Sequence, residues 1–331
     1  MNIFNKQPFL IAEISFNYKS LVSDDFSFFE VVKLLVKQAK ESGVNGINFH
    51  IGDSDFAHCN FSESDLKDNL TFEEYEQLAD CCHDNGLTVI VTPGDFNVVD
   101  SLDDFIDAYK ISASDLTNIP FIEYVASKNK PVLLSTAAAT INEIGQAVNS
   151  IEDQSNFKIA LMHSVLSYPT NLEDANLSMI KDLSDNFKDY NIGYSDYTKS
   201  DNNMFVLTTA YNYGAIILEK FFTLDKSLEG QEYSMDSDDV RIFRLNVGIL
   251  SKINGFKNKQ PLICESSSRK NLRKSIVAKR DIKVGDIIDE SDVEFKRPGT
   301  GISPAEIKNI LGKTASVNID KGSLIEFNMF E

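Results

Sequence analysis

Residues 9–13 read Phe-Leu-Ile-Ala-Glu, a short apolar run that ends in a carboxylate, and the return of this pattern along the chain decides the fold. Runs that are rich in β-branched and aliphatic residues and end in polar ones predict buried strands. Eight such runs precede residue 220: Phe9–Glu13, Gly46–His50, Leu87–Thr92, Ala108–Ile111, Val132–Ser135, Ile159–His163, Ile192–Ser195 and Ala215–Glu219.

Amphipathic segments separate these runs. Apolar residues between Phe28 and Leu35 follow the spacing of one helix face. Thr71 with Glu74, and likewise Thr140 with Glu143, has the form of a capping box at a helix start. Eight strands alternating with helices predict a (β/α)8 TIM barrel, although a doubly wound open sheet would give a similar alternation.

The pattern changes after residue 254. Residues 255–274 are polar and rich in Lys, Asn and Ser, which is typical of a linker. Beyond them, short strand candidates alternate with glycine-containing turns: Ser275–Ala278, Ile287–Ile288, Val293–Phe295, Ala315–Ile319 and Leu324–Glu326. We therefore predict a barrel over residues 1–254, a linker over 255–274 and a small β-rich domain over 275–331.

The chain of 331 residues carries 50 acidic and 32 basic side chains, a formal charge of −18. An acidic surface repels nucleic acid and anionic lipid, so we expect neither as a partner. The spacing of the four cysteines fits no zinc site, and no apolar run is long enough to cross a membrane. With no apolar signal-peptide run at the N-terminus, we predict a cytoplasmic protein.

Active sites of such barrels lie at the C-terminal ends of the strands. Glu13 and Glu219 end the first and last runs, which are neighbours in a closed barrel. They are candidates for acid–base catalysis or for ion pairs with Lys110 or Lys220, and both interpretations stay open. The strand-end rule selects Glu13, Asn48, His50, Thr92, Lys110, Ser135, His163, Ser195, Asp196, Glu219 and Lys220.

Several stretches resemble the sialic acid synthase family, whose members are N-acetylneuraminate synthase-like barrels followed by an antifreeze-like SAF domain of β-clip fold. The resemblance runs in order through nearly the whole chain. The stretches that carry it are Phe9–Asn17, Lys110–Asn118, Lys130–Thr136, His163–Leu177, Glu219–Asp225, Ser275–Gly285 and Lys296–Ile302.

The resemblance implies a transferase of carbohydrate biosynthesis. The family condenses phosphoenolpyruvate with an open-chain N-acylated amino sugar to give a 3-deoxy-nonulosonic acid. A divalent metal ion, Mn²⁺ or Mg²⁺, polarises the sugar aldehyde. The family forms domain-swapped homodimers, in which an arginine of the SAF domain, matched here by Arg297, reaches the partner's barrel.

The family's working residues match a defined set of positions here. The resemblance assigns catalytic roles to Glu13, Glu219 and Asp225. Glu232 stands where the family usually has Asp, and Asn48 replaces the usual lysine of the second strand. The substrate-binding positions it implies are Asn48, Thr92, Lys110, Ser135, His163, Ser195, Lys220, Glu232 and Arg297.

Two departures affect the metal. The family's seventh strand ends Ser-Asp-His-Thr, whereas residues 195–198 read Ser-Asp-Tyr-Thr. Its eighth reads Glu-Lys-His-Phe-Thr, whereas residues 219–223 read Glu-Lys-Phe-Phe-Thr. Those two histidines are the family's protein ligands for the ion. Tyr197 is a poor ligand for manganese at neutral pH and Phe221 cannot be one, so the usual metal site is absent.

Three interpretations remain open, and we place the first ahead. The protein is a synthase with a rebuilt site, in which His50, His163 and either Asp196 or Glu219 are candidate ligands. Alternatively, it is a catalytically inactive homologue that binds a sugar or a partner. In the third, Lys110 or Lys220 acts as a base or Schiff-base lysine in different carbonyl chemistry.

Overall fold

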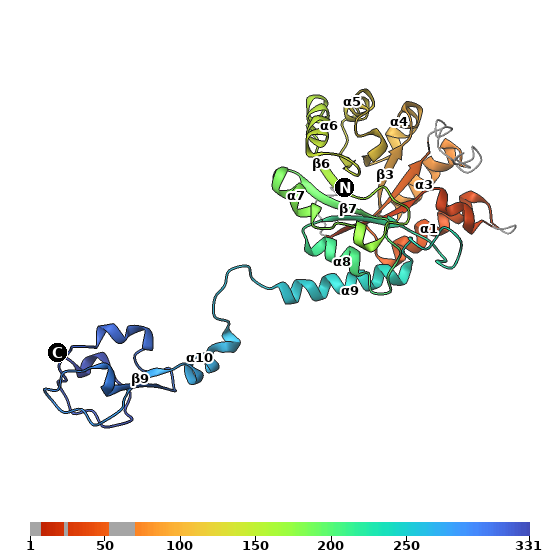
Figure 1. Ribbon diagram of the computed structural model, residues 1–331. Coiled ribbons are helices and arrows are strands. Elements are labelled where there is room, and N and C mark those ends of the chain that lie inside the picture. The colour runs from red at the N-terminus through yellow and green to blue at the C-terminus, as the bar shows by residue number, and fades with distance from the viewer. Residues whose placement is uncertain (1–7, 23–25, 53–69) are drawn as a thin grey trace. The chain divides into compact units, whose positions relative to one another are not determined.

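The computed structural model describes residues 8–22, 26–52 and 70–331, and the chain divides into two compact units, Met1–Asn254 and Gly255–Glu331. In the first unit, eight parallel strands close into a barrel in chain order, because the first strand pairs with the last (Figure 1). This closure confirms the TIM barrel and excludes the open sheet. The strands are β1 Phe9–Ile14, β2 Gly46–Ile51, β3 Thr88–Pro93, β4 Ala108–Ile111, β5 Val132–Ser135, β6 Ile159–His163, β7 Asn191–Asp196 and β8 Ile217–Phe221.

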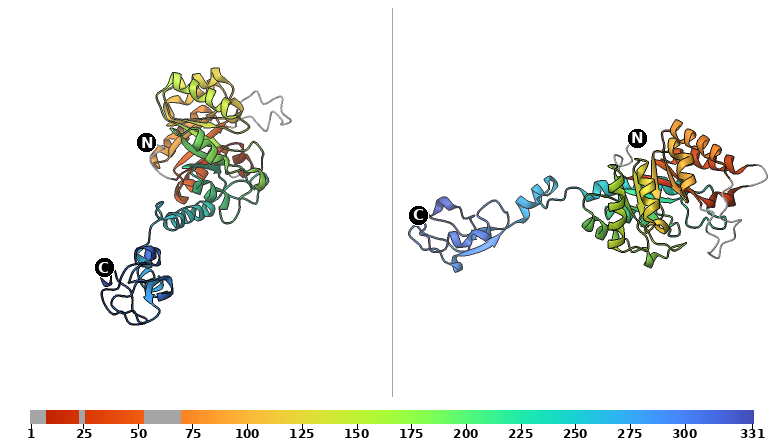
Figure 2. Two further views of the ribbon diagram at one scale, coloured as in Figure 1. Left: turned by 60° about the vertical axis from the view of Figure 1, so that its left-hand side comes forward. Right: turned by 90° about the horizontal axis from the view of Figure 1, so that it is seen from above.

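Helices follow the strands and surround the barrel (Figure 2). The predicted capping boxes are confirmed, since Thr71 and Thr140 accept from the amides of Glu74 and Glu143. The helices of this unit are α1 Phe28–Ser42, α3 Phe72–Asp84, α4 Phe96–Leu102, α5 Ile119–Ser127, α6 Ile141–Gln154, α7 Met179–Asn186, α8 Phe205–Asn212 and α9 Ser237–Asn254. Short 3-10 helices span Phe16–Leu21, Asp103–Phe105, Ala113–Asp115 and Leu172–Asp174.

The last strand starts two residues later than its apolar run. The amide of Ala215 still bonds to the carbonyl of Ala210 at the end of α8, and only at Ile216 does the backbone turn to β7, through the carbonyl of Ile192. Ala215 therefore belongs to the turn that ends α8, although it is as apolar as the strand that follows.

Alternate residues of each strand face opposite ways. One set, which includes Ile11, Ile90 and Leu133, fills the barrel interior, and the other packs against the helices. Gly193 on β7 belongs to the crowded interior. A Cβ there would lie 2.2 Å from Sδ of Met162 and 2.7 Å from the carbonyl oxygen of Ile217, so only glycine fits.

The second unit has its own apolar core around Ile276, Ile288 and Ile325. Its antiparallel strands are β9 Ser275–Ala278 and β10 Val293–Lys296, and its 3-10 helices span Ile263–Glu265, Glu290–Asp292, Pro304–Asn309 and Phe327–Met329. The strands expected near Ile287, Ala315 and Leu324 contribute isolated bridges instead.

The segment predicted as a linker contains a helix, α10 Ser266–Leu272. The amide of Leu262 donates to Oε2 of Glu265 (2.8 Å) at the preceding turn, which helps to start this helical segment. Its polar composition had hidden the helix, because all of its residues are exposed and no apolar face marks it. Within the described ranges, no helix is both long and apolar enough to cross a bilayer.

Candidate active site

The C-terminal end of the barrel interior is polar. Lys110 lies two residues after Ala108 on β4, so it faces the barrel interior as Ala108 does. By the same alternation, Glu13 follows Ile11 and Glu219 follows Ile217. The interior therefore changes from an apolar layer to a layer of ionisable and hydroxyl side chains within one pleat of the sheet.

Glu219 is the centre of this polar layer and is fully buried, with 0% of its surface exposed. Its Oε1 accepts from Nδ2 of Asn48 (2.8 Å), and its Oε2 accepts from Oγ of Ser195 (2.6 Å) and from the ammonium of Lys110. Thr92 extends the network, since its hydroxyl donates to Oδ1 of Asn48 (3.0 Å). The side-chain amide of Asn48 therefore links β3 to β8 through hydrogen bonds to Thr92 and Glu219.

Glu13 shares the same lysine. Its Oε2 lies 3.4 Å from Nζ of Lys110, and its Oε1 lies 3.4 Å from Nδ1 of His50. The chain of contacts runs from His50, whose side chain is 30% exposed, through Glu13 and Lys110 to Glu219. The two carboxylates expected to be neighbours are brought together, with Lys110 between them.

The surroundings shift the pKa values of these two carboxyl groups in opposite directions. Burial alone would raise the pKa of Glu13, but the ammonium of Lys110 and the imidazole of His50 lower it to about 2. Burial raises the pKa of Glu219, and the attraction of Lys110 offsets this only in part. Lys110 and His50 therefore hold Glu13 in its ionised form.

Lys110 is held in its charged form. Burial by itself would lower the pKa of its ammonium, whereas Glu13 and Glu219 raise it above the ordinary value. A nucleophilic or basic lysine must be unprotonated, so this environment opposes the Schiff-base interpretation for Lys110.

An aromatic cluster includes Tyr197 and Phe221, the two positions at which the resemblance implied metal-binding histidines. Tyr197, Phe221 and Tyr233 are buried together; the rings of Tyr197 and Phe221 are 5.7 Å apart, and those of Phe221 and Tyr233 are 5.3 Å apart. The ring of Tyr168 lies 4.6 Å from that of Tyr197. Both Glu13 and Glu219 act electrostatically on Tyr197, so the cluster borders the polar layer.

These residues do not fit a divalent ion. Phe221 has no donor atom, and burial raises the pKa of Tyr197 well above its ordinary value, which keeps the phenol neutral and a weak ligand. No group of three or more His, Cys, Asp or Glu side chains suited to a metal occurs in the described part of the chain. His163 and Asp196 do not join His50 in a substitute set, because their strand positions face the helix layer and not the barrel interior.

We expected His163 and Lys220 to contact a substrate, but both side chains bond to protein groups away from the polar layer. His163 bonds through Nε2 to the carbonyl of Ala175 (3.1 Å) and stacks on Tyr194, a member of the outer core. Lys220 pairs with Asp196 (2.8 Å) and donates to the carbonyl of Thr198 (2.7 Å). His163, Asp196 and Lys220 occupy the alternate strand positions that face the helices. The strand-end rule selected them because it takes residues from both faces of a strand.

Ser135 also lies at its strand end, within 3.1 Å of the hydroxyl of Ser164. Asp225 is exposed beyond β8, where its Oδ1 accepts from the amide and hydroxyl of Ser227. The Glu232 side chain is likewise exposed. Arg297 belongs to the second unit, where its Nε donates to the carbonyl of Leu272 (3.1 Å).

Tyr168 and Tyr233 were not among the expected site residues. Burial and the nearby Glu13 raise the pKa of Tyr168 to about 12, which places its phenol beside the charged layer. Both tyrosines come from loops after strands, where the apolar periodicity gives no signal. The adjacency of Tyr168 and Pro169, joined by a cis peptide, is the one local sign of a special turn.

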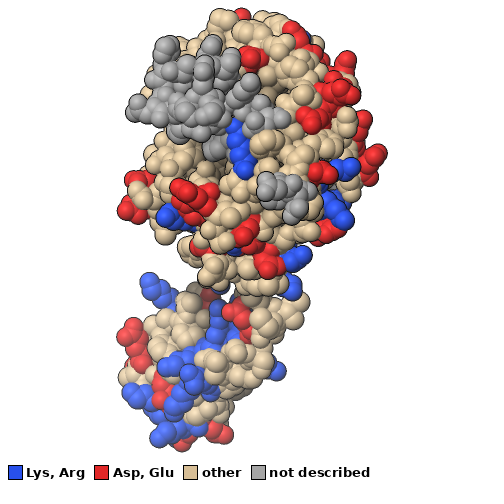
Figure 3. Space-filling view, turned by 90° about the vertical axis from the view of Figure 1, so that its right-hand side faces the viewer, with Lys and Arg blue, Asp and Glu red and all other residues tan. Residues whose placement is uncertain are grey.

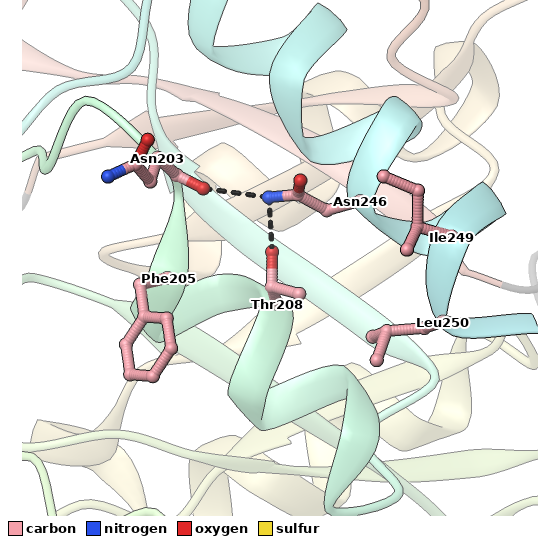
Figure 4. Close-up of a pocket in the computed structure, with 6 residues that line it drawn as sticks. All are labelled: Asn203, Phe205, Thr208, Asn246, Ile249 and Leu250. Carbon is pink, nitrogen blue, oxygen red and sulfur yellow. Dashed lines mark hydrogen bonds between the residues drawn. The ribbon is translucent and has the colours of Figure 1, made fainter. Parts of the chain in front are cut away.

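A pocket of about 250 Å³ lies outside the barrel, between α8 and α9 (Figure 4). Asn246 crosses it and donates to the carbonyl of Asn203 (2.7 Å) and the hydroxyl of Thr208 (3.1 Å). The rest of its lining is Phe205, Ile249 and Leu250, so it holds no titratable group and none of the expected site residues.

Comparisons with known proteins agree with this architecture. The chain is 34% identical to an uncharacterized protein from Methanocaldococcus jannaschii, over 96% of this chain and 93% of that protein. It is 28% identical to the N,N'-diacetyllegionaminic acid synthase of Legionella pneumophila, over 98% and 94%. The solved N-acetylneuraminic acid synthetase of Leptospira borgpetersenii shares the fold, with a TM-score of 0.70 at 24% identity over 81% of this chain and 94% of that one.

Family profiles give the same assignment for both units. The NeuB family profile matches residues 35–259, and the SAF domain profile matches residues 273–331. Because the first match covers more than half of the chain, this protein belongs to the NeuB family and carries a SAF domain at its C-terminal end.

Proposed function

We propose that this protein condenses phosphoenolpyruvate with an N-acylated amino sugar to give a 3-deoxy-nonulosonic acid, at a site that lacks the two metal-binding histidines. The observation that carries the proposal is the buried Glu13–Lys110–Glu219 network at the C-terminal end of a NeuB-family barrel. A relative that spans nearly the whole chain is named as a legionaminic acid synthase.

Lys110 is suited to an anionic substrate. Its contact with Glu219 is short, while its contact with Glu13 is long, at 3.4 Å. An incoming phosphate or carboxylate can replace the weaker contact without removing the lysine from its anchor. The proposed role of Lys110 is to bind phosphoenolpyruvate, and that of Glu219 is to hold Lys110, Asn48 and Ser195 in place.

The reaction needs no nucleophile from the protein. Carbon 3 of the enol attacks the sugar aldehyde, water adds at carbon 2, and phosphate leaves. The charge that develops must be met by fixed protein groups. Here the nearby groups that can meet it are the ammonium of Lys110, the partly exposed imidazole of His50 and the hydroxyl of Ser135.

The first test is binding of phosphoenolpyruvate, measured by calorimetry. We expect binding to the wild type and at least tenfold weaker binding to Lys110→Met. The matched control is Lys220→Met with Asp196→Asn, which removes a buried lysine pair from the other face of the barrel and leaves binding unchanged. A wild type that does not bind phosphoenolpyruvate would rule out the proposal.

The second test is phosphate release from phosphoenolpyruvate with N-acetylmannosamine and with 2,4-diacetamido hexoses. We expect turnover with at least one sugar, and turnover that persists in EDTA. Binding without turnover across the panel would identify a catalytically inactive, sugar-binding homologue. Activity that EDTA abolishes and Mn²⁺ restores would contradict the modified site while leaving the reaction in place.

We also propose that the active form is a homodimer in which Arg297 acts at the barrel of a second copy. Charge supports this arrangement: residues 1–254 hold 39 acidic and 18 basic side chains, and residues 255–331 hold 11 acidic and 14 basic ones. Figure 3 shows Lys and Arg gathered on the smaller unit. Opposite charge favours association of one chain's SAF domain with another chain's barrel.

Light scattering tests the dimer, and mixed variants test the shared site. Arg297→Ala and Lys110→Met are each expected to be inactive alone. Mixing and refolding them together should restore part of the activity, because a hybrid dimer contains one intact site. A monomeric protein, or no recovery on mixing, would refute the arrangement.

A further inference from the structure

His50 is the one residue of the described polar layer that joins solvent to the buried carboxylates. It is the next-to-last residue of β2 and lies on the interior side, two positions after Asn48, and its side chain is 30% exposed. Its backbone carbonyl accepts from the hydroxyl of Ser15 (3.5 Å), which ties the strand end to the neighbouring strand. Its Nδ1 faces Oε1 of Glu13 at 3.4 Å.

The other ring nitrogen is available. Among the described residues, no hydrogen bond engages Nε2 of His50, while the carboxylate of Glu13 favours the tautomer with its proton on Nδ1. A histidine whose inner nitrogen is held by a buried carboxylate and whose outer nitrogen is open has the geometry of a general acid and base.

Other groups nearby are less suited to proton transfer. Glu219 is fully buried, and both of its oxygens already accept hydrogen bonds. Lys110 is held charged by two carboxylates, and Tyr197 is held as a neutral phenol in the aromatic cluster. The carboxylate of Glu13 is itself only 1% exposed.

We propose that His50 is the catalytic acid and base of this site and that Glu13 is its positioning residue. This inference rests on the proposed condensation, which requires one proton to be given and one to be taken. Both transfers can be made by one imidazole that has a single open nitrogen. The proposed role of His50 does not involve a metal ion.

The sequence of steps balances. The His50 imidazolium gives its Nε2 proton to the aldehyde oxygen while carbon 3 of the enol bonds to the aldehyde carbon and carbon 2 becomes electron-poor. The neutral imidazole then takes a proton from the water whose oxygen bonds to carbon 2. As the bond from carbon 2 to the phosphate oxygen breaks, the new hydroxyl gives its proton to the departing phosphate. The ketone forms, and the imidazolium is regenerated.

The experiment measures phosphate release and phosphoenolpyruvate affinity in the full-length protein. We expect His50→Ala and His50→Gln to lower kcat by about 10²- to 10⁴-fold, the usual range for a lost general acid–base group, with little change in affinity for phosphoenolpyruvate. Added imidazole should restore part of the kcat of His50→Ala, which a purely structural role would not permit. Glu13→Gln should lower kcat and resist rescue by imidazole.

The chain contains a matched control. His83 also faces a carboxylate, Asp107, at 3.1 Å, but this pair lies at α3, outside the barrel interior. His83→Gln is expected to keep the wild-type kcat. The His50 and His83 variants change partly exposed side chains, so their melting temperatures should agree with that of the wild type within a few degrees.

The outcomes separate this inference from the proposed function. Wild-type turnover with an unchanged kcat in His50→Ala would overturn the inference and leave the condensation standing. Loss of phosphoenolpyruvate binding in His50→Ala would also overturn it, by assigning His50 to binding. Failure of the wild type to turn over any sugar would overturn both.

Discussion

Lys110 and Lys220 are both buried and both paired with carboxylates, but they lie in different regions of the barrel. Lys110 faces the interior, between Glu13 and Glu219, and connects through Glu13 to the partly exposed His50. Lys220 faces the helix layer, where Asp196 and the carbonyl of Thr198 enclose it. Residues 219 and 220 are adjacent in sequence, yet their side chains belong to these two regions.

The difference shows how position on a strand separates catalytic from structural roles. The interior pair keeps a weak contact, from Lys110 to Glu13, that a ligand can replace. The pair in the helix layer has short contacts only, of 2.8 and 2.7 Å, and both of its side chains are buried. The same kind of lysine–carboxylate pair is therefore suited to ligand binding on the interior face and to structural support on the helix face.

The largest expected effect comes from breaking the pair in the helix layer. Lys220→Met leaves the buried carboxylate of Asp196 without its counter-charge, so the free energy of unfolding should fall by about 3–5 kcal/mol. Urea denaturation measures this change. The double variant with Asp196→Asn removes both charges and should recover most of the stability. Little loss in the single variant would contradict a tightly enclosed pair.

A somewhat smaller effect is expected from Glu13, on the interior side. Its pKa is about 2 when folded, against an ordinary value of 4.5, so its contribution to stability is present above pH 4.5 and is lost as the pH falls toward 2. Wild type should exceed Glu13→Gln in stability by about 3 kcal/mol at pH 6, and the two should converge near pH 2. Parallel pH curves for the two proteins would show that the carboxylate is not held by Lys110 and His50.

The smallest expected effect concerns His163 in the helix layer. Burial lowers its pKa below the ordinary value of 6.5, so the folded state resists protonation. Its contribution to stability is therefore present above pH 6.5 and declines as the pH falls below it. His163→Gln should show a flatter stability curve between pH 7.5 and 5. Unfolding measured across this range checks the slope, and a steeper curve for the variant would reverse the assignment.

Much of the fold could be predicted from the chain alone. The eight apolar runs mark all eight strands, and the capping residues Thr71 and Thr140 mark two helix starts. The errors lie where the apolar signal is continuous or missing. The start of β8 is hidden because Ala215 and Ile216 are as apolar as the strand, and α10 is hidden because it has no buried face.

The candidate site could be predicted only in part. The strand-end rule selected Glu13, Asn48, Lys110 and Glu219, whose side chains the structure brings together in one polar layer. It could not separate them from His163 and Lys220, because a barrel strand is buried on both faces and its sequence does not alternate between apolar and polar. Without that alternation, nothing local tells which residues point inward.

The sequence by itself determined the order of strands and helices, the family, and the presence of Tyr197 and Phe221 at the ends of the seventh and eighth strand motifs, since each depends on residue type and spacing. Only the tertiary structure decided which strand-end side chains share the interior, that Lys110 lies between two carboxylates, and that His50 meets Glu13. Those facts follow from barrel closure, which brings β1 beside β8 and fixes the direction of every alternate side chain.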